Sequence, residues 1–360
     1  MITEVKMKRR LISALLLISL LSSILLTGCV EEKEEAIQYK SYSFNYFDTI
    51  STIIGIDTKD EFAAASKAAL DLVGEYHKLF DIYNEYEGMN NLCTVNKLVD
   101  GVHVEVEVDR RIIDMLLYAK EMYTLTGGKM NIAMGSVLSI WHDYRTAGID
   151  NPAKAELPPM EALLAASEHT DINDIIINEE KSTVYLADPE MKLDVGAFAK
   201  GYAVEMVARM LIEMGKTAYV VNVGGNIRTI GAKADGSKWM TGVENPDTSD
   251  DTTPYIEYLE MAGESIVTSG SYQRYYLVGG KRYHHIIDPD TLMPSVGLLS
   301  VSIICQNSAD GDGLSTALFC MSIEEGLALV NSIDGIEALW VDQNGNKTYS
   351  DGFKDYLYVE

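Results

Sequence analysis

The sequence predicts an α+β fold in which largely antiparallel sheets pack against helices. Stretches of alternating apolar and polar residues, typical of strands, are joined by short turns rich in Gly, Asn and Asp, as in residues 217–231. Between them lie segments with apolar residues at helical spacing, such as residues 60–83 and 110–125. Hairpins interleaved with helices are typical of this fold class. Because no internal repeat, low-complexity segment or second composition regime is present, we expect one compact domain over residues 41–360.

The predicted elements follow one another along the chain. The first half holds a long strand or hairpin and then helices and short strands, at residues 39–57, 60–83, 103–108, 110–125, 158–169, 174–178, 182–186 and 197–214. The second half is mostly strands around one helical stretch, at residues 217–231, 238–245, 254–261, 268–294, 298–305, 316–330 (the helical stretch), 336–342 and 346–351.

The N-terminus is predicted to be a lipoprotein signal peptide, residues 1–28. Four basic residues precede an apolar run that is short for a membrane span, and the sequence Leu-Thr-Gly-Cys at residues 26–29 follows at once. Small residues before a cysteine resemble the bacterial lipobox, in which the cysteine, here Cys29, is lipidated. An uncleaved anchor helix is the alternative. Residues 29–40 are polar and charged and predict a tether, so the domain is expected outside the cytoplasm, lipid-anchored to the cell membrane.

The charge balance is strongly acidic. The chain carries 29 basic and 54 acidic residues, a net charge of −25. Removal of residues 1–28, which hold four basic residues and one acidic residue, would leave about −28. This charge argues against nucleic acid or an anionic bilayer as the main ligand. If the protein binds a phosphate compound, a metal ion, a lysine or a helix N-terminus must compensate locally.

Two glycine-containing segments suggest close approach to such a ligand. Asp194 to Lys200 places small residues where a strand becomes a helix, so free N–H groups, the helix dipole and the lysine could face an anion. Close helix packing explains this segment equally well. Gly224 and Gly225 interrupt a strand, which often marks a bulge or a close backbone approach.

A carboxylate and a hydroxyl near the C-terminal end suit a metal ion. Asp312 and Thr316 are four residues apart, so in a helix that begins at about Asp312 both oxygens lie on one face. Together with water and a phosphate oxygen, they suit Mg²⁺, which prefers oxygen ligands. The alternative is an Asp N-cap followed by an ordinary helical threonine.

Residues 268–294 contain more polar and titratable residues than a purely structural hairpin needs. A Thr-Ser-Gly turn and a Gly-Gly hairpin signal precede His284 and His285, which lead into Ile-Ile-Asp-Pro. Adjacent side chains of an extended segment point to opposite faces, so only one histidine can reach a common site. His285 is either a catalytic base or a packed core histidine.

Five motifs in one order resemble the ApbE family, the FAD:protein FMN transferases, whose members are often lipoproteins. These are DVGAFAKGYAVE, VVNVGGNIRTIG, TSGSYQRYY, HHIIDPDT and ADGDGLSTALF. Each motif is short, and their order carries the specificity. The resemblance covers the chain from about Phe47 to Cys320. It implies a single ApbE or T-fold-like domain.

The resemblance also implies roles for individual residues. His285 falls on the family's base. Magnesium would be held by the Ala197 carbonyl and the side chains of Asp312 and Thr316. The FAD site would include Tyr83, Asn131, Asp194, Lys200, Gly224, Gly225, Thr268 and Ile287. Two departures stand in this region, because Asn131 replaces the usual Asp and Ser136 a common Pro.

The implied activity is Mg²⁺-dependent transfer of FMN from FAD to a Thr or Ser hydroxyl of an acceptor protein, with release of AMP. Exported or membrane redox-complex subunits are the acceptors that the family implies. Two other readings stay open. One is a Mg²⁺-dependent FAD pyrophosphatase that yields FMN and AMP, and the other is a non-catalytic FAD-binding lipoprotein.

Overall fold

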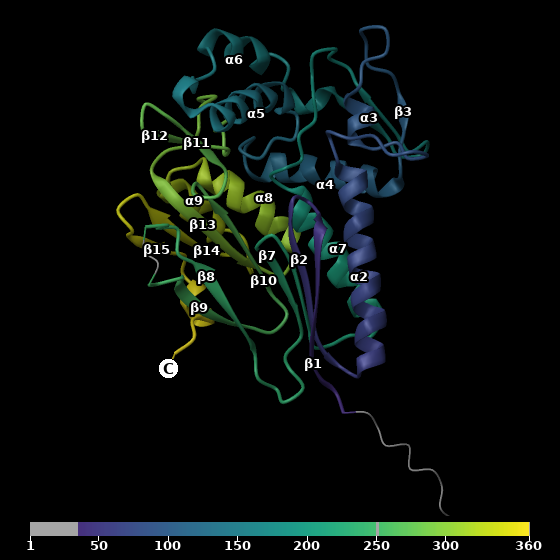
Figure 1. The fold of residues 1–360 in the computed structure, drawn as a ribbon, viewed down its shortest axis with the longest axis vertical. Coiled ribbons are helices and arrows are strands. Elements are labelled where there is room, and N and C mark those ends of the chain that lie inside the picture. Colours follow the sequence, from purple (N-terminus) through teal and green to yellow (C-terminus); the bar gives the residue numbers. More distant parts are fainter. Residues whose placement is uncertain (1–34, 250–251, 360) are drawn as a thin grey trace, which may run out of the picture. The chain divides into compact units, whose positions relative to one another are not determined.

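An eight-stranded antiparallel sheet lies at the centre of the fold (Figure 1). The computed structural model describes residues 35–249 and 252–359, so the predicted signal peptide and Cys29 lie outside the described residues. The strand order is β1-β2-β6-β7-β10-β13-β14-β15, and each neighbouring pair is antiparallel. These strands are β1 (Ile37–Tyr46), β2 (Thr49–Asp57), β6 (Tyr219–Val223), β7 (Asn226–Ile230), β10 (Ser265–Gly270), β13 (Leu298–Cys305), β14 (Glu337–Asp342) and β15 (Lys347–Tyr349).

Smaller sheets and helices surround the large sheet. The small sheets are formed by β3 (Val106–Glu107), β5 (Thr183–Leu186) and β4 (Ile175–Asn178), by β8 (Trp239–Glu244) and β9 (Tyr255–Met261), and by β11 (Tyr275–Val278) and β12 (Lys281–His284). The described helices are α2 (Lys59–Phe80), α3 (Leu92–Asn96), α4 (Arg110–Leu125), α5 (Gly135–Asp150), α6 (Met160–Ser167), α7 (Ala199–Glu213), α8 (Ser308–Phe319) and α9 (Ile323–Val330), with 3₁₀ turns at Pro152–Lys154, Ile172–Asp174 and Phe353–Tyr356. Along the described part of the chain, no helix is long and apolar enough to cross a membrane.

The large sheet is covered on both faces, because consecutive residues of a strand point to opposite sides. In β10, Ile266 packs into a cluster with Val243 and Leu259 of the β8–β9 hairpin. Its neighbour Val267 faces α8, where a Cβ added at Gly311 would lie 2.8 Å from a Val267 methyl carbon. Helices α2 and α7 pack on β2, β6 and β7 through a further buried apolar cluster. The result is the predicted α+β architecture in one compact unit, Ile37–Glu360.

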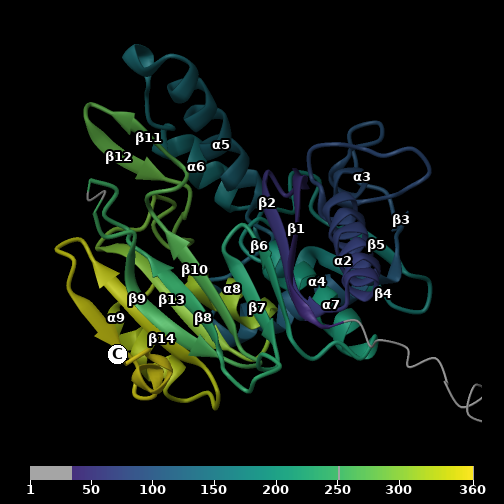
Figure 2. The ribbon, with the colours of Figure 1, turned by 60° about the horizontal axis from the view of Figure 1, so that its bottom comes forward.

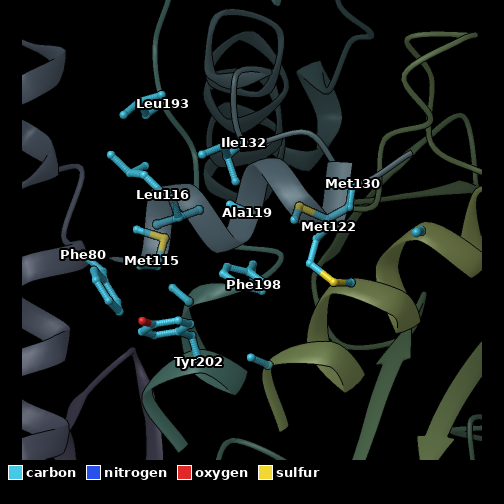
Figure 3. Close-up of a cluster of buried hydrophobic side chains, with 14 of the residues drawn as sticks. Phe80, Met115, Leu116, Ala119, Met122, Met130, Ile132, Leu193, Phe198 and Tyr202 are labelled. Atoms are coloured by element: carbon cyan, nitrogen blue, oxygen red, sulfur yellow. The ribbon is translucent and has the colours of Figure 1, made fainter. Parts of the chain in front are cut away.

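The largest hydrophobic cluster lies around α4 and the start of α7. Figure 3 shows Met115, Leu116 and Met122 of α4 with Phe198 and Tyr202. Met115, Leu116 and Phe198 are fully buried, and burial of each such side chain stabilises the fold by about 1.5–3 kcal/mol. This cluster therefore anchors the N-terminal end of α7. Lys200 lies in the first turn of this helix, as predicted.

Several predicted elements match the structure and several do not. Helix α4 spans the predicted residues 110–125, and residues 39–57 form the β1–β2 hairpin. The predicted strand 103–108 is wrong except for the two residues of β3. The predicted helical stretch 316–330 is two helices, α8 and α9, because Ser322 caps a new helix through a capping box with Glu325. Strand β1 begins at Ile37, inside the residues predicted as tether.

Helix α5 was not predicted. Only Gly135, Val137, Trp141 and Gly148 of this helix are buried. Its apolar stripe is therefore too thin for a clear 3.6-residue period, which is the main helix signal in a sequence.

Candidate functional site

A cavity of about 540 Å³ brings together residues that are far apart in the sequence. Every residue of the predicted FAD, metal and base sets lines it, namely Tyr83, Asn131, Asp194, Ala197, Lys200, Gly224, Gly225, Thr268, His285, Ile287, Asp312 and Thr316. The start of α7, the β6–β7 turn, β10, the segment after β12 and the middle of α8 supply most of them. A cavity of this size, with a few convergent polar groups, is typical of a small-molecule site.

The closest helix contact at the cavity is between α7 and α8. A Cβ added at Gly201 would lie 2.4 Å from both the Ser308 carbonyl oxygen and the Asp312 Cβ, so only glycine fits without a shift of the helices. The Gly201 N–H donates to Asp312 Oδ2 at 2.7 Å, and Lys200 Nζ lies 3.6 Å from Asp312 Oδ1. Close packing of α7 on α8 thus explains why residue 201 is a glycine. The same packing holds Lys200 beside Asp312.

Helix α8 begins earlier than predicted. Its N-cap is Asn307, whose side-chain oxygen accepts from the Ala309 N–H at 3.0 Å, so the expectation of a helix that begins at about Asp312 is wrong. The alternative that Asp312 is the N-cap of this helix is also wrong, because Asn307 is the N-cap. Asp312 and Thr316 still share a helix face and both line the cavity. Asp310 instead accepts a hydrogen bond from the Tyr118 hydroxyl, and burial raises the pKa of its carboxyl group.

The donor set around Asp312 fits a hard divalent cation. Asp312 is 4% exposed, and its Oδ1 atom has Lys200 Nζ as a distant neighbour at 3.6 Å. Among the residues that the structure describes, Thr316 Oγ1 has one long contact, of 3.5 Å, with Ser269 Oγ. Oxygen atoms with room for a further ligand, together with the nearby Ala197 backbone, suit Mg²⁺.

The same region does not form an all-side-chain metal cage. Within residues 35–249 and 252–359, no group of three or more His, Cys, Asp or Glu side chains gathers to hold a metal. A cation bound here would therefore take hydroxyl, backbone and ligand oxygens beside the single carboxylate.

The two adjacent histidines have different environments. His284 is 7% exposed, its Nε2 lies 2.7 Å from the Ser295 carbonyl oxygen, and its Nδ1 accepts from the Ile286 N–H at 3.2 Å. Both of its ring nitrogens are thus used, and the ring packs edge-on against Phe319. His284 is the packed histidine of the pair.

His285 is half-buried on the cavity wall. Its Nδ1 lies 3.2 Å from the Arg274 carbonyl oxygen, which can only accept, so Nδ1 carries the proton and Nε2 keeps a lone pair. Burial first, and then the neighbouring Arg274, His284 and Arg145, lower the pKa of the imidazole to about 3. The ring is therefore neutral near pH 7, as a proton acceptor must be.

The paired glycines form a tight turn rather than a bulge. Gly224 and Gly225 have φ values of +58° and +91°, which suits the two-residue turn between β6 and β7. A Cβ at Gly224 would lie 2.7 Å from Thr49 Oγ1, whereas a Cβ at Gly225 would meet nothing within 4 Å. Gly224 is required by packing, and Gly225 leaves open space at the cavity.

Several predicted FAD-site residues also hold the cavity wall together. Asn131 donates from Nδ2 to the Thr170 carbonyl oxygen at 3.0 Å and accepts from the Ala133 N–H at 2.9 Å. Its amide thus shapes the turn before α5. The Thr268 hydroxyl lies 2.8 Å from Ser302 Oγ on the neighbouring strand β13, and Ile287 is buried.

Two other predicted residues keep polar groups or rings open to the cavity. Asp194 accepts from the Gly196 N–H at 2.8 Å, and burial raises the pKa of its carboxyl group. Tyr83 is 63% exposed, and its ring centroid lies 5.5 Å from that of His142. An exposed aromatic ring at a cavity mouth offers a stacking surface.

Helix α5 provides a cavity wall that the sequence patterns do not predict. Leu138, Trp141, His142 and Arg145 follow helical spacing and all line the cavity, as does Arg274 just before β11. If a helix had been predicted over residues 135–150, these four residues would have been recognised as one helix face. Arg274 stands inside the TSGSYQRYY motif, and no feature of its neighbours in the chain distinguishes it.

The chain matches proteins of one family in sequence. The ApbE family profile matches residues 47–340. A FAD:protein FMN transferase of Klebsiella pneumoniae is 32% identical over 276 residues, which are 74% of this chain and 82% of the relative. A FAD:protein FMN transferase of Vibrio cholerae is 29% identical over 352 residues, 95% of this chain and 98% of the relative. These names confirm the expected enzyme class, a transferase.

Solved structures agree with the sequence matches. The ApbE protein of Thermotoga maritima superposes with a TM-score of 0.77 at 27% identity, over 90% of this chain and 100% of that one. The flavin transferase ApbE of Vibrio cholerae has a TM-score of 0.73 at 25% identity, over 89% and 100% of the two chains. The predicted fold class is confirmed, and the chain belongs to the ApbE family.

Proposed function

We propose that the protein is a FAD:protein FMN transferase that moves FMN from FAD to a Thr or Ser hydroxyl of an acceptor protein and releases AMP. One observation carries the proposal. A single cavity joins a neutral histidine, His285, to a lysine and an oxygen donor pair, Lys200 with Asp312 and Thr316. The names of the curated relatives support the same activity.

The pyrophosphate of FAD would bind where α7 begins. Lys200 and the dipole of α7 offer positive potential there, whereas the N–H groups of Ala199 and Gly201 already donate to the Val195 carbonyl oxygen and to Asp312 Oδ2. The Asp312 and Thr316 side chains and the Ala197 carbonyl would hold Mg²⁺. When bound, the ion would neutralise charge on the phosphate oxygens. Positioning and charge stabilisation provide most of the catalysis in phosphoryl-type transfer, so few reactive side chains are needed.

His285 would act as the general base. Its Nε2 lone pair takes the proton of the acceptor hydroxyl, and the hydroxyl oxygen forms a bond to the FMN phosphorus. The bond from that phosphorus to the bridging oxygen breaks, and AMP leaves with the oxygen. The low pKa of His285 in the free protein reflects burial and the two nearby arginines. A bound anion opposes that effect and raises the proton affinity of the ring during the reaction.

The place of action follows from the N-terminal pattern. The basic residues, the short apolar run and Cys29 support export and a lipid anchor at the cell membrane. The acceptor would then be an exported or membrane redox-complex subunit. Substitution of Cys29 by Ser would move the protein from the membrane fraction to the soluble fraction.

The deciding experiment mixes the purified mature protein with FAD, Mg²⁺ and an exported redox subunit, and then looks for covalent flavin fluorescence on a denaturing gel. We expect a fluorescent acceptor band that disappears without Mg²⁺. Steady AMP release without acceptor would instead support a FAD pyrophosphatase. Stoichiometric FAD retention without AMP release or acceptor labelling would support a non-catalytic binding protein.

A further inference from the structure

Two arginines flank His285 on the cavity wall. Arg145 lies on α5, and Arg274 lies in the turn before β11; both line the cavity. The Arg274 carbonyl oxygen accepts from the His285 N–H at 3.0 Å and is 3.2 Å from His285 Nδ1. The backbone of Arg274 thus orients His285, while its side chain remains available.

Close packing of α5 on β11 brings the two guanidinium groups to the same region. A Cβ added at Gly148 would lie 2.5 Å from a ring carbon of Tyr276, so the helix and the strand approach as closely as glycine allows. Arg145 precedes Gly148 by three residues, so the two lie on the same face of α5. Arg274 lies two residues before Tyr276, in the bend that leads into β11, and both arginines line the cavity. Burial and the charge of Arg274 lower the pKa of Arg145, which agrees with their proximity.

Neither arginine has a carboxylate partner among the described residues. The side chain of Arg145 contacts His142 Nδ1 at 3.1 Å, and no described Asp or Glu oxygen lies within 4.0 Å of either guanidinium group. Asp194 lies in the same cavity and is influenced by both charges, but it forms no ion pair with them. Glu244, another carboxylate that lines the cavity, accepts from the Tyr272 hydroxyl at 2.9 Å.

Most of the described arginines do have a carboxylate partner. Acidic residues outnumber basic ones by 54 to 29 in the chain, and Arg110, Arg111, Arg209 and Arg228 form ion pairs with Asp or Glu. Arg282 forms none among the described residues and stacks on the Tyr275 ring instead. In so acidic a protein, two cations that line one cavity and have no ion-paired carboxylate among the described residues indicate a site for an anion from outside the chain.

We propose that Arg145 and Arg274 form a second anion subsite, which binds one oxyanion next to His285. The subsite is built on α5 and the β10–β11 turn, whereas Lys200 and Asp312 belong to α7 and α8. Guanidinium groups bind phosphate and carboxylate oxygens in bidentate fashion. The anion is a phosphate of the bound nucleotide or a carboxylate of the acceptor segment. The inference rests on the proposed function for the nature of these ligands.

The first test measures equilibrium binding of FMN and of riboflavin, which lacks the phosphate, by calorimetry at low salt. The variants are Arg145→Gln, Arg274→Gln, the double variant, and the control Arg282→Gln. Arg282 lies on the same hairpin but stacks on the Tyr275 ring at 4.3 Å and does not line the cavity. If the subsite takes the nucleotide phosphate, the double variant binds FMN at least about tenfold more weakly. Riboflavin binding and the control stay unchanged.

The second test measures the acceptor KM of the same variants in the transfer assay. If the subsite takes an acceptor carboxylate, FMN affinity is unchanged and the acceptor KM rises about tenfold. The proposal is overturned if FMN and riboflavin binding weaken equally, or if neither FMN affinity nor acceptor KM changes. If the wild-type protein transfers no flavin, the proposed function fails, and the subsite is then judged on FMN against riboflavin alone.

Discussion

The cavity has two walls that differ in how they are built. The wall of Lys200 and Asp312 is part of the central core, where α7 and α8 touch at Gly201. The wall of His285 rests on a separate cluster that includes Trp141 and Tyr276. Figure 2 shows α5, α6 and the β11–β12 hairpin grouped together at one end of the large sheet.

The difference indicates how each wall responds to change. The α7–α8 wall is fully packed, so a substitution there alters stability and ligand binding together. The α5–β11 wall has cations without carboxylate partners among the described residues and a half-buried base. Arginines without ion pairs and a half-buried histidine contribute little to the stability of the fold, so these side chains are available to bind ligands. We expect substitutions of Arg145, Arg274 and His285 on this wall to change activity while the fold stays intact.

The largest expected effect separates the two histidines of the second wall. His285→Ala removes the base and should lower the transfer rate by about 10²- to 10⁴-fold, with the free energy of unfolding nearly unchanged. His284→Ala is the matched variant, and it should instead lower the free energy of unfolding by about 1–3 kcal/mol, because buried hydrogen-bond partners lose their ring. Flavin transfer and urea unfolding of both variants provide the measurement. Near-normal transfer by His285→Ala would show that His285 is not the general base.

Asp312→Asn tests the first wall without disturbing its packing. The amide oxygen can still accept from the Gly201 N–H, but the negative charge is lost. We expect apparent Mg²⁺ affinity in the transfer assay to fall by about tenfold to a hundredfold, since hydrogen bonds and contacts with charged groups are worth about 1.5–3 kcal/mol. A Mg²⁺ titration of transfer measures it, with Asp310→Asn as control because that carboxyl group faces Tyr118. Equal Mg²⁺ dependence in the wild type and Asp312→Asn contradicts the metal assignment.

Gly201→Ala tests the helix contact itself. The new methyl group would meet the Ser308 carbonyl oxygen, a backbone atom that cannot move alone. Overpacking should lower the free energy of unfolding by about 1–3 kcal/mol and should weaken FAD binding in parallel. The control is Gly313→Ala, where the methyl group meets the flexible end of Met122 at 2.9 Å. Chemical unfolding and FAD titration measure the pair, and equal stability of the two variants would show that the α7–α8 contact is less rigid than described.

Per pH unit, the smallest expected effect is the change in stability in acid. The folded pKa of His285, about 3, lies below its value in the unfolded chain, near 6.5. Between these values the unfolded state binds more protons, so this histidine lowers stability as pH falls from about 6.5 toward 3. The slope for one group cannot exceed about 1.4 kcal/mol per pH unit. Urea unfolding at several acidic pH values should therefore show a shallower loss for His285→Gln than for the wild type. Parallel curves would contradict the low pKa.

Local patterns predicted much of the fold. Helix α4 was predicted because its apolar spacing and the Gly127–Gly128 stop lie in the segment or directly after it, and Asp109 caps its start in the structure. Helix α5 was missed because one of its faces lines the cavity instead of packing into the core. Polar residues therefore interrupt its apolar spacing. Helix α8 was predicted to start too late because Asn307, Ser308, Asp310 and Asp312 are all favourable N-cap residues, so the sequence offers several possible starts within six residues.

The sequence by itself determined the family, the antiparallel α+β architecture and the residues of the first wall, because ordered motifs and local periodicity are properties of neighbouring residues. Only the tertiary structure decided which ring nitrogen of His285 is free, that Asp310 faces Tyr118, and that Arg145 and Arg274 line one cavity. These features depend on contacts between segments far apart in the chain. Such contacts are set by packing, for example the approach of Gly148 to Tyr276, and no local pattern encodes them.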